Sequence, residues 1–359
     1  MQRPVLGILT AGKGQVPGNR EMFRFVQLAC REAGLTAYVF TPAQVNWSRG
    51  TVKGYRYVKG RWQPGRFPLP HVVYNRIPNR QLEVSGEVQL TKRRLRAKGI
   101  PLYNAGYLNK YDLYQLLRGN PQVQPHLPWT KLVRRRSDIE HALQRFGRVY
   151  LKPKHAFAGK GIMTVSLGSA GWALRYRQGD ANREIRGASL GELWPKLEQK
   201  MGRQSYIVQQ AIQLAHYKGR TFDVRLLAQK NGAGQWQVSG MGVRVASKGG
   251  ITTHVPNGGY IAPAPEVFST VFGANASSVQ ESVSRLAMLV APAVEKGYQG
   301  LFGEMSMDIG LDASGHPWFF EANAKPMRFD EPGIRRVGLR TLTAYVQYLA
   351  RKAGEGAKA

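Results

Sequence analysis

Cysteine is almost absent from this sequence, since Cys30 is the only one among 359 residues. One thiol excludes a disulfide within the chain and a zinc site built from cysteines. Because disulfides are typical of oxidising compartments, we expect a cytoplasmic protein. Long apolar runs are also missing: none approaches the roughly 20 residues that a transmembrane helix requires. The apolar stretch within residues 1–12 is too short for a signal sequence and predicts a first strand.

Acidic residues are scarce relative to basic ones. Lys and Arg total 52, Asp and Glu total 22, and the formal net charge is +30. Such a charge attracts polyanions but carries no information about the fold. The basic segments 91–98 and 134–136 are typical of solvated helix faces. Because the sequence contains no helix-turn-helix, zinc-finger or RNP-like motif, we do not expect a nucleic acid partner.

The apolar pattern at the N-terminus predicts a small α/β domain. A strand at 5–10, a helix at 20–33 and a strand at 36–40 follow one another with short connections. This order implies a parallel strand pair with a right-handed crossover. Residues 51–63 predict a hairpin with a Lys-Gly turn. The domain is expected to end near residue 105.

The pattern changes after residue 105. A short helix is predicted at 109–118, and another runs to Phe146 with Ser137 as its N-cap. We expect substrate specificity to lie in the N-terminal domain and in loops near 165–190 and 248–275, where we find no motif. The further elements that we predict are strands at 149–152, 161–166, 205–210, 222–229 and 236–245, a helix at 278–296, a hairpin at 303–323 and a helix at 331–352.

The hairpin at 303–323 carries the sharpest chemical pattern. A register that sets Asp308 opposite Glu321 leaves one face apolar and places Asn323 two residues further along the polar face. Two opposed carboxylates repel each other, and a divalent cation removes that cost. Oxygen ligands suit Mg²⁺ or Mn²⁺. The alternative is a solvated polar face with an arginine on one carboxylate. The other pairs in this register are Ile309 with Phe320, Leu311 with Trp318 and Met307 with Ala322.

A second pattern is an apolar strand that ends in Lys152 and continues into a loop of small residues. Gly159 and Gly161 let the backbone approach a ligand closely, so that N–H groups there can bind phosphate. Lys152 adds a positive charge. No Walker A sequence occurs. A plain glycine hairpin with solvated lysines remains the open alternative.

A third pattern is the strand Phe222-Asp223-Val224-Arg225, in which Asp223 and Arg225 share one face. Arg244 lies on the next predicted strand. Two arginines near a phosphate site can stabilise a transferring phosphoryl group. A structural Asp–Arg pair is the alternative.

In this order the segments resemble the ATP-grasp superfamily over roughly residues 105–330, and within it the YheC/YheD group of spore-coat-associated proteins. The resemblance lies in NKYDLYQLL, YLKPKHAFAGKGI, IVQQAIQL, FDVRLLAQKN, WQVSGMGVRVA and FFEANAKP. It implies an α/β and α+β protein in which two α+β subdomains clamp ATP behind a small α/β domain. The implied boundaries are 1–105 for the N-terminal domain, 106–207 for the central subdomain, 208–353 for the C-terminal subdomain and 354–359 for a frayed tail.

The resemblance also implies a set of site residues. ATP and Mg²⁺ (or Mn²⁺) are the implied cofactors. Two positions depart from the relatives' pattern: Gln209-Gln210 replaces an acidic residue of many relatives, and Thr253-His254 replaces the Thr-Asn of related ligases. The implied ligands are Lys110, Lys152, Gly159, Lys160 and Gly161 for phosphate, Gln209, Gln210, Ala211 and Ile212 for adenine, Asp308, Glu321 and Asn323 for the metal, and Arg225 and Arg244 for the γ-phosphate or an acyl-phosphate.

The implied reaction is ligation. A carboxylate takes the γ-phosphate to form an acyl-phosphate and ADP, and an amine then displaces phosphate to form an amide. The partners are carboxylate and amine substrates such as an amino acid, a peptide or an acidic polymer, and a homodimer is left open. The alternative is a non-catalytic, basic protein that is associated with the spore coat or binds polyanions, and whose ATP site is retained or vestigial.

Overall fold

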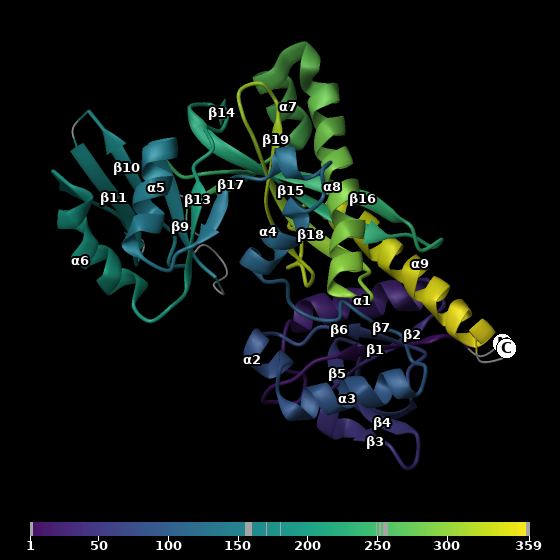
Figure 1. Cartoon of the computed structure of the whole chain (residues 1–359). Helices are drawn as coiled ribbons and strands as arrows, with labels where there is room; N and C mark the ends of the chain where they lie inside the picture. Colours follow the sequence, from purple (N-terminus) through teal and green to yellow (C-terminus); the bar gives the residue numbers. More distant parts are fainter. Residues whose placement is uncertain are drawn as a thin grey trace.

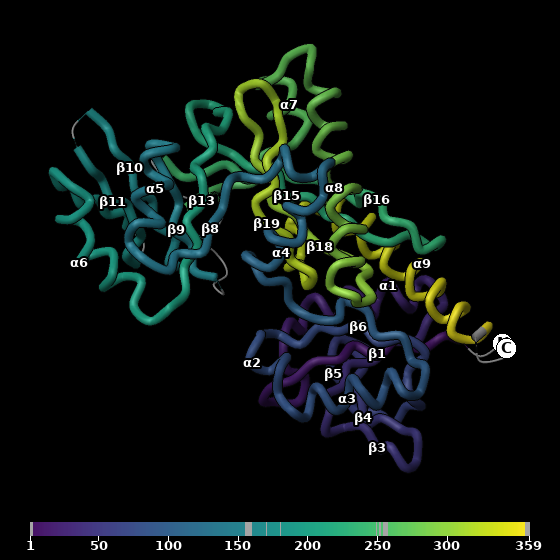
Figure 2. Tube along the Cα trace, in the orientation of Figure 1, coloured from purple at the N-terminus to yellow at the C-terminus, as the bar shows by residue number. Residues whose placement is uncertain are grey.

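The computed structural model describes residues 3–154, 160–169, 171–179, 181–248, 250, 253 and 258–356. Three sheets follow one another along this part of the chain (Figures 1 and 2). We call them the N-terminal, central and C-terminal sheets. The two tracts without a motif contain elements that were not predicted, among them β11 (Gly171–Gln178), β12 (Ala181–Gly187) and α7 (Ala264–Phe272). The expected loop at 165–190 is therefore wrong, and helix replaces loop at 264–272. Among the described helices, none combines the length and apolarity needed to cross a bilayer.

The N-terminal sheet has the order β3-β4-β2-β1-β6-β7, with β5 paired to β4. β1 runs parallel to β2 and β6, which confirms the predicted strand–helix–strand unit. Asn19 caps α1 by accepting a hydrogen bond from the Met22 amide. The elements are β1 (Val5–Leu9), α1 (Arg20–Glu32), β2 (Thr36–Phe40), η1 (Pro42–Gln44), β3 (Val45–Asn46), β4 (Thr51–Val58), β5 (Arg61–Pro68), β6 (Val72–Asn75), α2 (Arg80–Glu83), α3 (Gly86–Ala97) and β7 (Leu102–Tyr103).

The central sheet is antiparallel, in the order β12-β11-β10-β9-β13-β8. Helices α5 and α6 pack in one core against it. The predicted N-cap Ser137 is wrong: α5 begins at Arg136, and the Asp138 carboxylate accepts from the amides of Arg134 and Arg135, so the cap forms two residues earlier. The elements are β8 (Thr130–Leu132), α5 (Arg136–Phe146), β9 (Arg148–Pro153), β10 (Met163–Gly168), β11 (Gly171–Gln178), β12 (Ala181–Gly187), α6 (Leu190–Met201) and β13 (Tyr206–Gln210).

The C-terminal sheet has the order β17-β16-β15-β18-β19, with β14 paired to β15. Its apolar face packs against α8, and α4, which lies between the first two sheets in sequence, packs on α8 in the same core. The elements are α4 (Lys110–Arg118), η2 (Gln124–His126), β14 (His216–Tyr217), β15 (Arg220–Lys230), β16 (Trp236–Val245), β17 (Tyr260–Ala262), α7 (Ala264–Phe272), η4 (Gly273–Asn275), α8 (Ala276–Tyr298), β18 (Glu304–Leu311), β19 (Pro317–Asn323) and α9 (Pro332–Gly356).

The last helix, α9, ties the two ends of the chain together. Leu342, Tyr345, Val346 and Leu349 lie in the same apolar cluster as residues of β1 and α1. Figure 1 shows α9 alongside α1. The helix continues to Gly356, so it enters the segment that we expected to be a frayed tail, and 357–359 lie outside the described residues. The N-terminal core is therefore completed by the C-terminal end.

Candidate functional site

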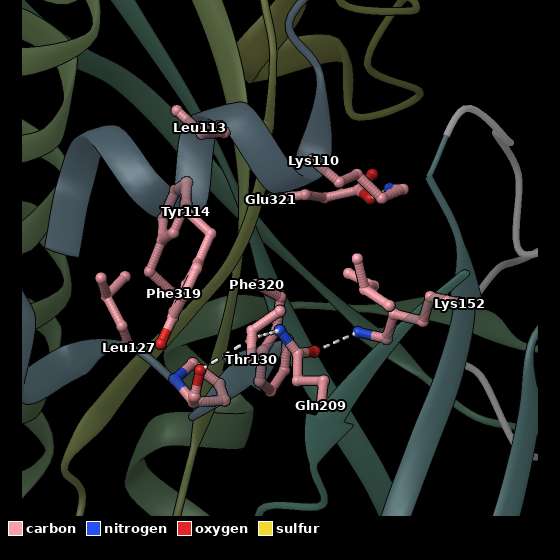
Figure 3. Close-up of a pocket in the computed structure, with 12 residues that line it drawn as sticks. Lys110, Leu113, Tyr114, Leu127, Thr130, Lys152, Gln209, Phe319, Phe320 and Glu321 are labelled. Atoms are coloured by element: carbon pink, nitrogen blue, oxygen red, sulfur yellow. Dashed lines mark hydrogen bonds and ion pairs between the residues drawn. The ribbon is translucent and has the colours of Figure 1, made fainter. Parts of the chain in front are cut away.

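A pocket lies between the central sheet and the C-terminal sheet, with α4 along one side (Figure 3). Side chains alternate along a strand, so Val149 and Leu151 of β9 pack in the core with α5 while Lys152 points to the opposite face. The same alternation on β18 buries Met307 and Ile309 and leaves Asp308 on the polar face. The described lining residues are Lys110, Leu113, Tyr114, Leu127, Pro128, Thr130, Lys152, Ile207, Gln209, Phe319, Phe320 and Glu321.

The pairing of β18 with β19 confirms the central part of the predicted register. Asp308 lies opposite Glu321, and Met307 lies opposite Ala322. Asn323 is next to Glu321 on the same side, because its Nδ2 donates to Glu321 Oε1 at 3.0 Å. The structure therefore brings the three candidate metal ligands together on the polar face of the hairpin.

Beyond Asp308 the predicted register is wrong. Ile309 pairs with Phe319 and Leu311 with Pro317, because a β-bulge lies between Asp308 and Ile309. The extra residue, Phe320, leaves the apolar face and lines the pocket beside Glu321. Its ring lies over Gly310, where a Cβ atom would come within 2.4 Å of Phe320 Cζ. The bulge therefore supplies an aromatic wall that strict alternation would have buried.

Protein cations already neutralise both carboxylates. Lys110 Nζ forms an ion pair with Glu321. Arg244 Nη2 lies 2.9 Å from Asp308 Oδ2, while its Nε and Nη2 donate to the two oxygens of Asp223 at 2.9 and 2.8 Å. The structural Asp–Arg pair that the sequence left open is thus present. Burial lowers the pKa of Arg244, but Asp223 and Asp308 outweigh it and raise the pKa overall, so Arg244 stays charged.

Arg225 is placed differently from Arg244. It lies opposite Asp308 on β15, and its guanidinium stacks on Phe329 with its Cζ 5.2 Å from the ring centre. Its Nε is buried and has no hydrogen-bond partner in the described part of the chain. Of the two candidate arginines, Arg225 therefore has more N–H donors left for a ligand.

The donor set fits a hard divalent cation. Asp308 Oδ1 is buried and accepts no hydrogen bond from any described residue, so one carboxylate oxygen is left over after Arg244 is satisfied. Burial raises the pKa of Asp308, but Arg244 and Arg225 outweigh burial and lower it, which keeps the carboxylate ionised. Within the described ranges no group of three or more His, Cys, Asp or Glu side chains comes together. The candidate ligands are thus two carboxylates and the Asn323 amide, all oxygen donors that suit Mg²⁺.

The second lysine of the pocket faces a neutral partner. Lys152 Nζ donates to Gln209 Oε1 at 2.6 Å, and Gln209 Nε2 donates to the Thr130 hydroxyl at 2.9 Å (Figure 3). Burial and the neighbouring Lys110 lower the pKa of Lys152 to about 7. Gln209 carries no charge and no described carboxylate forms an ion pair with Lys152, so its ammonium form can bind an anion. The role of Thr130 could not be predicted from the sequence, because β8 contains no recognisable motif.

The segment 209–212, predicted to contact adenine, already uses two of its backbone amides within the fold. The amides of Gln210 and Ala211 donate to Trp129 O at 2.8 Å and to Arg148 O at 3.2 Å. These two amides are therefore engaged within the fold and do not donate to adenine in this arrangement. The Gln209 side chain does not point toward an adenine position but accepts a hydrogen bond from Lys152.

Part of the predicted loop lies outside the described residues, including Gly159 and the rest of 155–159. Lys160 and Gly161 are described, and Gly161 has a φ of 72° and a carbonyl that accepts from the Tyr206 hydroxyl at 3.1 Å. His254 is also outside the described residues. Its neighbour Thr253 donates to Asp223 Oδ2 at 2.5 Å.

Comparisons with known proteins agree on the fold. A family model described as YheC/D like ATP-grasp matches residues 99–351. The endospore coat-associated protein YheD of Bacillus subtilis (strain 168) is 31% identical over 363 residues, covering 98% of this chain and 80% of that protein. The D-alanine-D-alanine ligase of Coxiella burnetii superposes with a TM-score of 0.56 at 13% identity, covering 99% of this chain and 98% of that one. The ATP-grasp ligase PsnB, in complex with a minimal precursor, Mg and ADP, gives 0.51 at 12% identity, with coverage of 96% and 98%.

Proposed function

Because the chain belongs to the YheC/D-like ATP-grasp family, we propose that it is an ATP- and Mg²⁺-dependent ligase that joins a carboxylate to an amine. One observation carries the proposal. Asp308 and Glu321 lie opposite each other on the polar face of a hairpin, and Glu321 lines a pocket together with Lys110 of α4 and Lys152 of β9. Paired carboxylates with facing cations are what a metal-bound triphosphate requires.

Each side chain has a role that follows from its position. Asp308, Glu321 and Asn323 would hold Mg²⁺, which when bound neutralises charge on the phosphate oxygens. Lys110 and Lys152 bind the phosphates as point charges. Arg225, stacked on Phe329 beside Asp308, stabilises charge that develops on the transferred phosphoryl group. The wall formed by Phe319 and Phe320 excludes water from the lysines.

The proposed reaction has two steps. An oxygen of the substrate carboxylate bonds to the γ-phosphorus of ATP as the bond to ADP breaks, which gives an acyl-phosphate. The amine then forms the C–N bond, inorganic phosphate leaves with the oxygen, and the amine proton passes to the leaving phosphate or to water. Positioning and electrostatics account for the catalysis, so no side-chain nucleophile is needed.

The test measures ADP release in the presence of ATP, Mg²⁺ and pools of amino acids or short peptides. We expect release that depends on the added substrate and that Glu321→Ala abolishes. Glu281→Ala is the matched control, because Glu281 is an exposed carboxylate on α8 that does not line the pocket. ADP release that is equal in both variants would contradict the assigned role of Glu321.

The net charge of +30 favours a second candidate, a basic protein that binds polyanions without turnover. In that case no pool yields ADP, and binding to an acidic polymer such as polyglutamate weakens steeply as salt is added. The name of the relative YheD, an endospore coat-associated protein, leads us to propose a cytoplasmic site of action with association to the spore coat.

A further inference from the structure

A second cavity lies between α1, α9 and the face of β15 and β18 that also carries Arg225 and Asp308. Its walls are largely apolar, and Met327, at 63% exposure, forms part of its open edge. At its inner end Glu304 accepts from Tyr74, Asn104 and Gln229, so that carboxylate is already satisfied. The remaining side chains that the argument uses are Leu227, Phe329, Leu339 and Leu342 on the walls and Arg328 and Arg335 at the rim.

At the rim of the cavity, two arginines stack on one aromatic ring. The Cζ atoms of Arg335 and Arg328 lie 5.0 and 5.8 Å from the centre of the Phe25 ring. Arg328 is paired with Glu21 and lies 3.6 Å from Asp330. No carboxylate among the residues that the structure describes pairs with Arg335. A stacked, half-buried guanidinium without a counter-ion beside an apolar cavity is a site for a ligand carboxylate.

One wall of the cavity belongs to the same sheet face as Asp308. Leu227 lines it and pairs with Ser306, which is two residues from Asp308 on the same face of β18, a step of about 7 Å. Phe329 lines it as well and stacks on Arg225. Between the cavity and Asp308 lie two buried polar atoms, Ser306 Oγ and Arg225 Nε, which have no hydrogen-bond partner in the described ranges. Buried polar atoms of this kind are usually paired, so a bound ligand is a natural partner.

We propose that this cavity, which we call the α1–α9 pocket, binds the amine substrate of the ligase, and that this substrate is an amino acid or short peptide with an apolar C-terminal residue. The apolar side chain packs against Leu227, Leu339 and Leu342, and the free carboxylate binds Arg335. The chain of the ligand then runs past Phe329, which directs its amine toward Arg225. The assignment of this ligand as the amine substrate rests on the proposed function, but its binding to the cavity does not require ATP.

The test is calorimetric titration of the full chain, without nucleotide, with three probes: Ala-Leu, Ala-Leu-amide and Ala-Ala. We expect Ala-Leu to bind, and each of the other probes to bind at least about tenfold more weakly, because the amide lacks the carboxylate and Ala-Ala lacks the apolar side chain. A tenfold loss corresponds to about 1.4 kcal/mol. Arg335→Gln should lower the affinity for Ala-Leu to that of the wild type for Ala-Leu-amide. Arg336→Gln, an exposed neighbour on the same helix that does not line the cavity, should bind like the wild type.

Two results would overturn the inference: Ala-Leu and its amide bind equally, or Arg335→Gln leaves Ala-Leu binding unchanged. Absence of binding by all three probes would also overturn it. A thermal shift with ATP and Mg²⁺ on the same preparations separates this failure from a failure of the proposed function, because the nucleotide site shares none of the residues exchanged here.

Discussion

Lys152 allows a quantitative test of the phosphate-binding assignment. Its pKa is about 7 because the side chain is buried near Lys110, whereas an exposed lysine titrates near 10.4. At pH 8 about nine in ten copies of Lys152 are therefore neutral, and at pH 6 about one in ten. Bound triphosphate favours the ammonium form. ATP binding should consequently add up to about 0.9 proton to Lys152 at pH 8 and about 0.1 at pH 6.

The proton uptake can be measured by calorimetric titration with ATP and Mg²⁺ in two buffers that differ in ionisation enthalpy. Lys152→Arg is the matched variant, because arginine keeps the positive charge but does not titrate in this range. The difference in uptake between wild type and Lys152→Arg isolates the contribution of this one group. Lys230→Arg is the control, since Lys230 pairs with Glu295 at 2.6 Å and does not line the pocket.

Equal uptake by the wild type and Lys152→Arg at pH 8 would refute the reasoning. A difference that is larger at pH 6 than at pH 8 would refute it as well, because the sign follows from a lowered pKa. In both cases a lowered pKa of Lys152 and its contact with the phosphates could not hold together, whatever the affinity of the chain for ATP.

Two further predictions concern stability and can be read from urea denaturation. In Glu304→Ala, Arg76, which lies 3.5 Å from the Glu304 carboxylate, becomes an uncompensated buried charge. The free energy of unfolding should therefore fall by about 3–5 kcal/mol. An unchanged urea midpoint would contradict this. Gly310→Ala would set a methyl group 2.4 Å from Phe320 Cζ and should cost about 1–3 kcal/mol. Gly354→Ala, where no atom lies within 4 Å of the new methyl group, should instead stabilise α9 by up to about 1 kcal/mol. A loss for both glycine variants would show that the close contact is not the cause.

Elements with a clear apolar period were predictable from the sequence, and elements without one were not. The strand at Trp236–Val245 and the helix at Arg20–Glu32 match their predictions within one residue. By contrast β12, at Ala181–Gly187, has mostly exposed side chains and no alternation to detect. Helix α6 contains Pro195, which sequence patterns treat as a helix breaker, so its apolar face was not recognised.

The candidate site was predictable from the sequence only where both residues of a pair lie on the same hairpin. The opposition of Asp308 and Glu321 follows from the hairpin, but two adjacent aromatic residues, Phe319 and Phe320, satisfy the apolar pattern in either register. The bulge that chooses between them depends on packing over Gly310. The link from Gln209 to Thr130 is also a tertiary contact, between strands 79 residues apart, and no local pattern encodes it.

The two explanations that the sequence left open for the hairpin apply to the same residues in different states of ligation. In this structure Lys110 neutralises Glu321 and Arg244 neutralises Asp308, which removes the repulsion that a metal would otherwise have to remove. A purely structural pairing would leave no acceptor unused, yet Asp308 Oδ1 has no partner among the described residues.

Nucleotide and metal binding should therefore be coupled. Triphosphate competes with Glu321 for Lys110, so its arrival frees a carboxylate oxygen for the cation, and by reciprocity the cation frees Lys110 for phosphate. We expect Mn²⁺ titrated by electron paramagnetic resonance to bind more tightly when a non-hydrolysable ATP analogue is present. We also expect Lys110→Ala to tighten Mn²⁺ binding without nucleotide, since Glu321 then has no competing cation. Weaker Mn²⁺ binding in Lys110→Ala would mean that the lysine organises the carboxylate rather than competes for it.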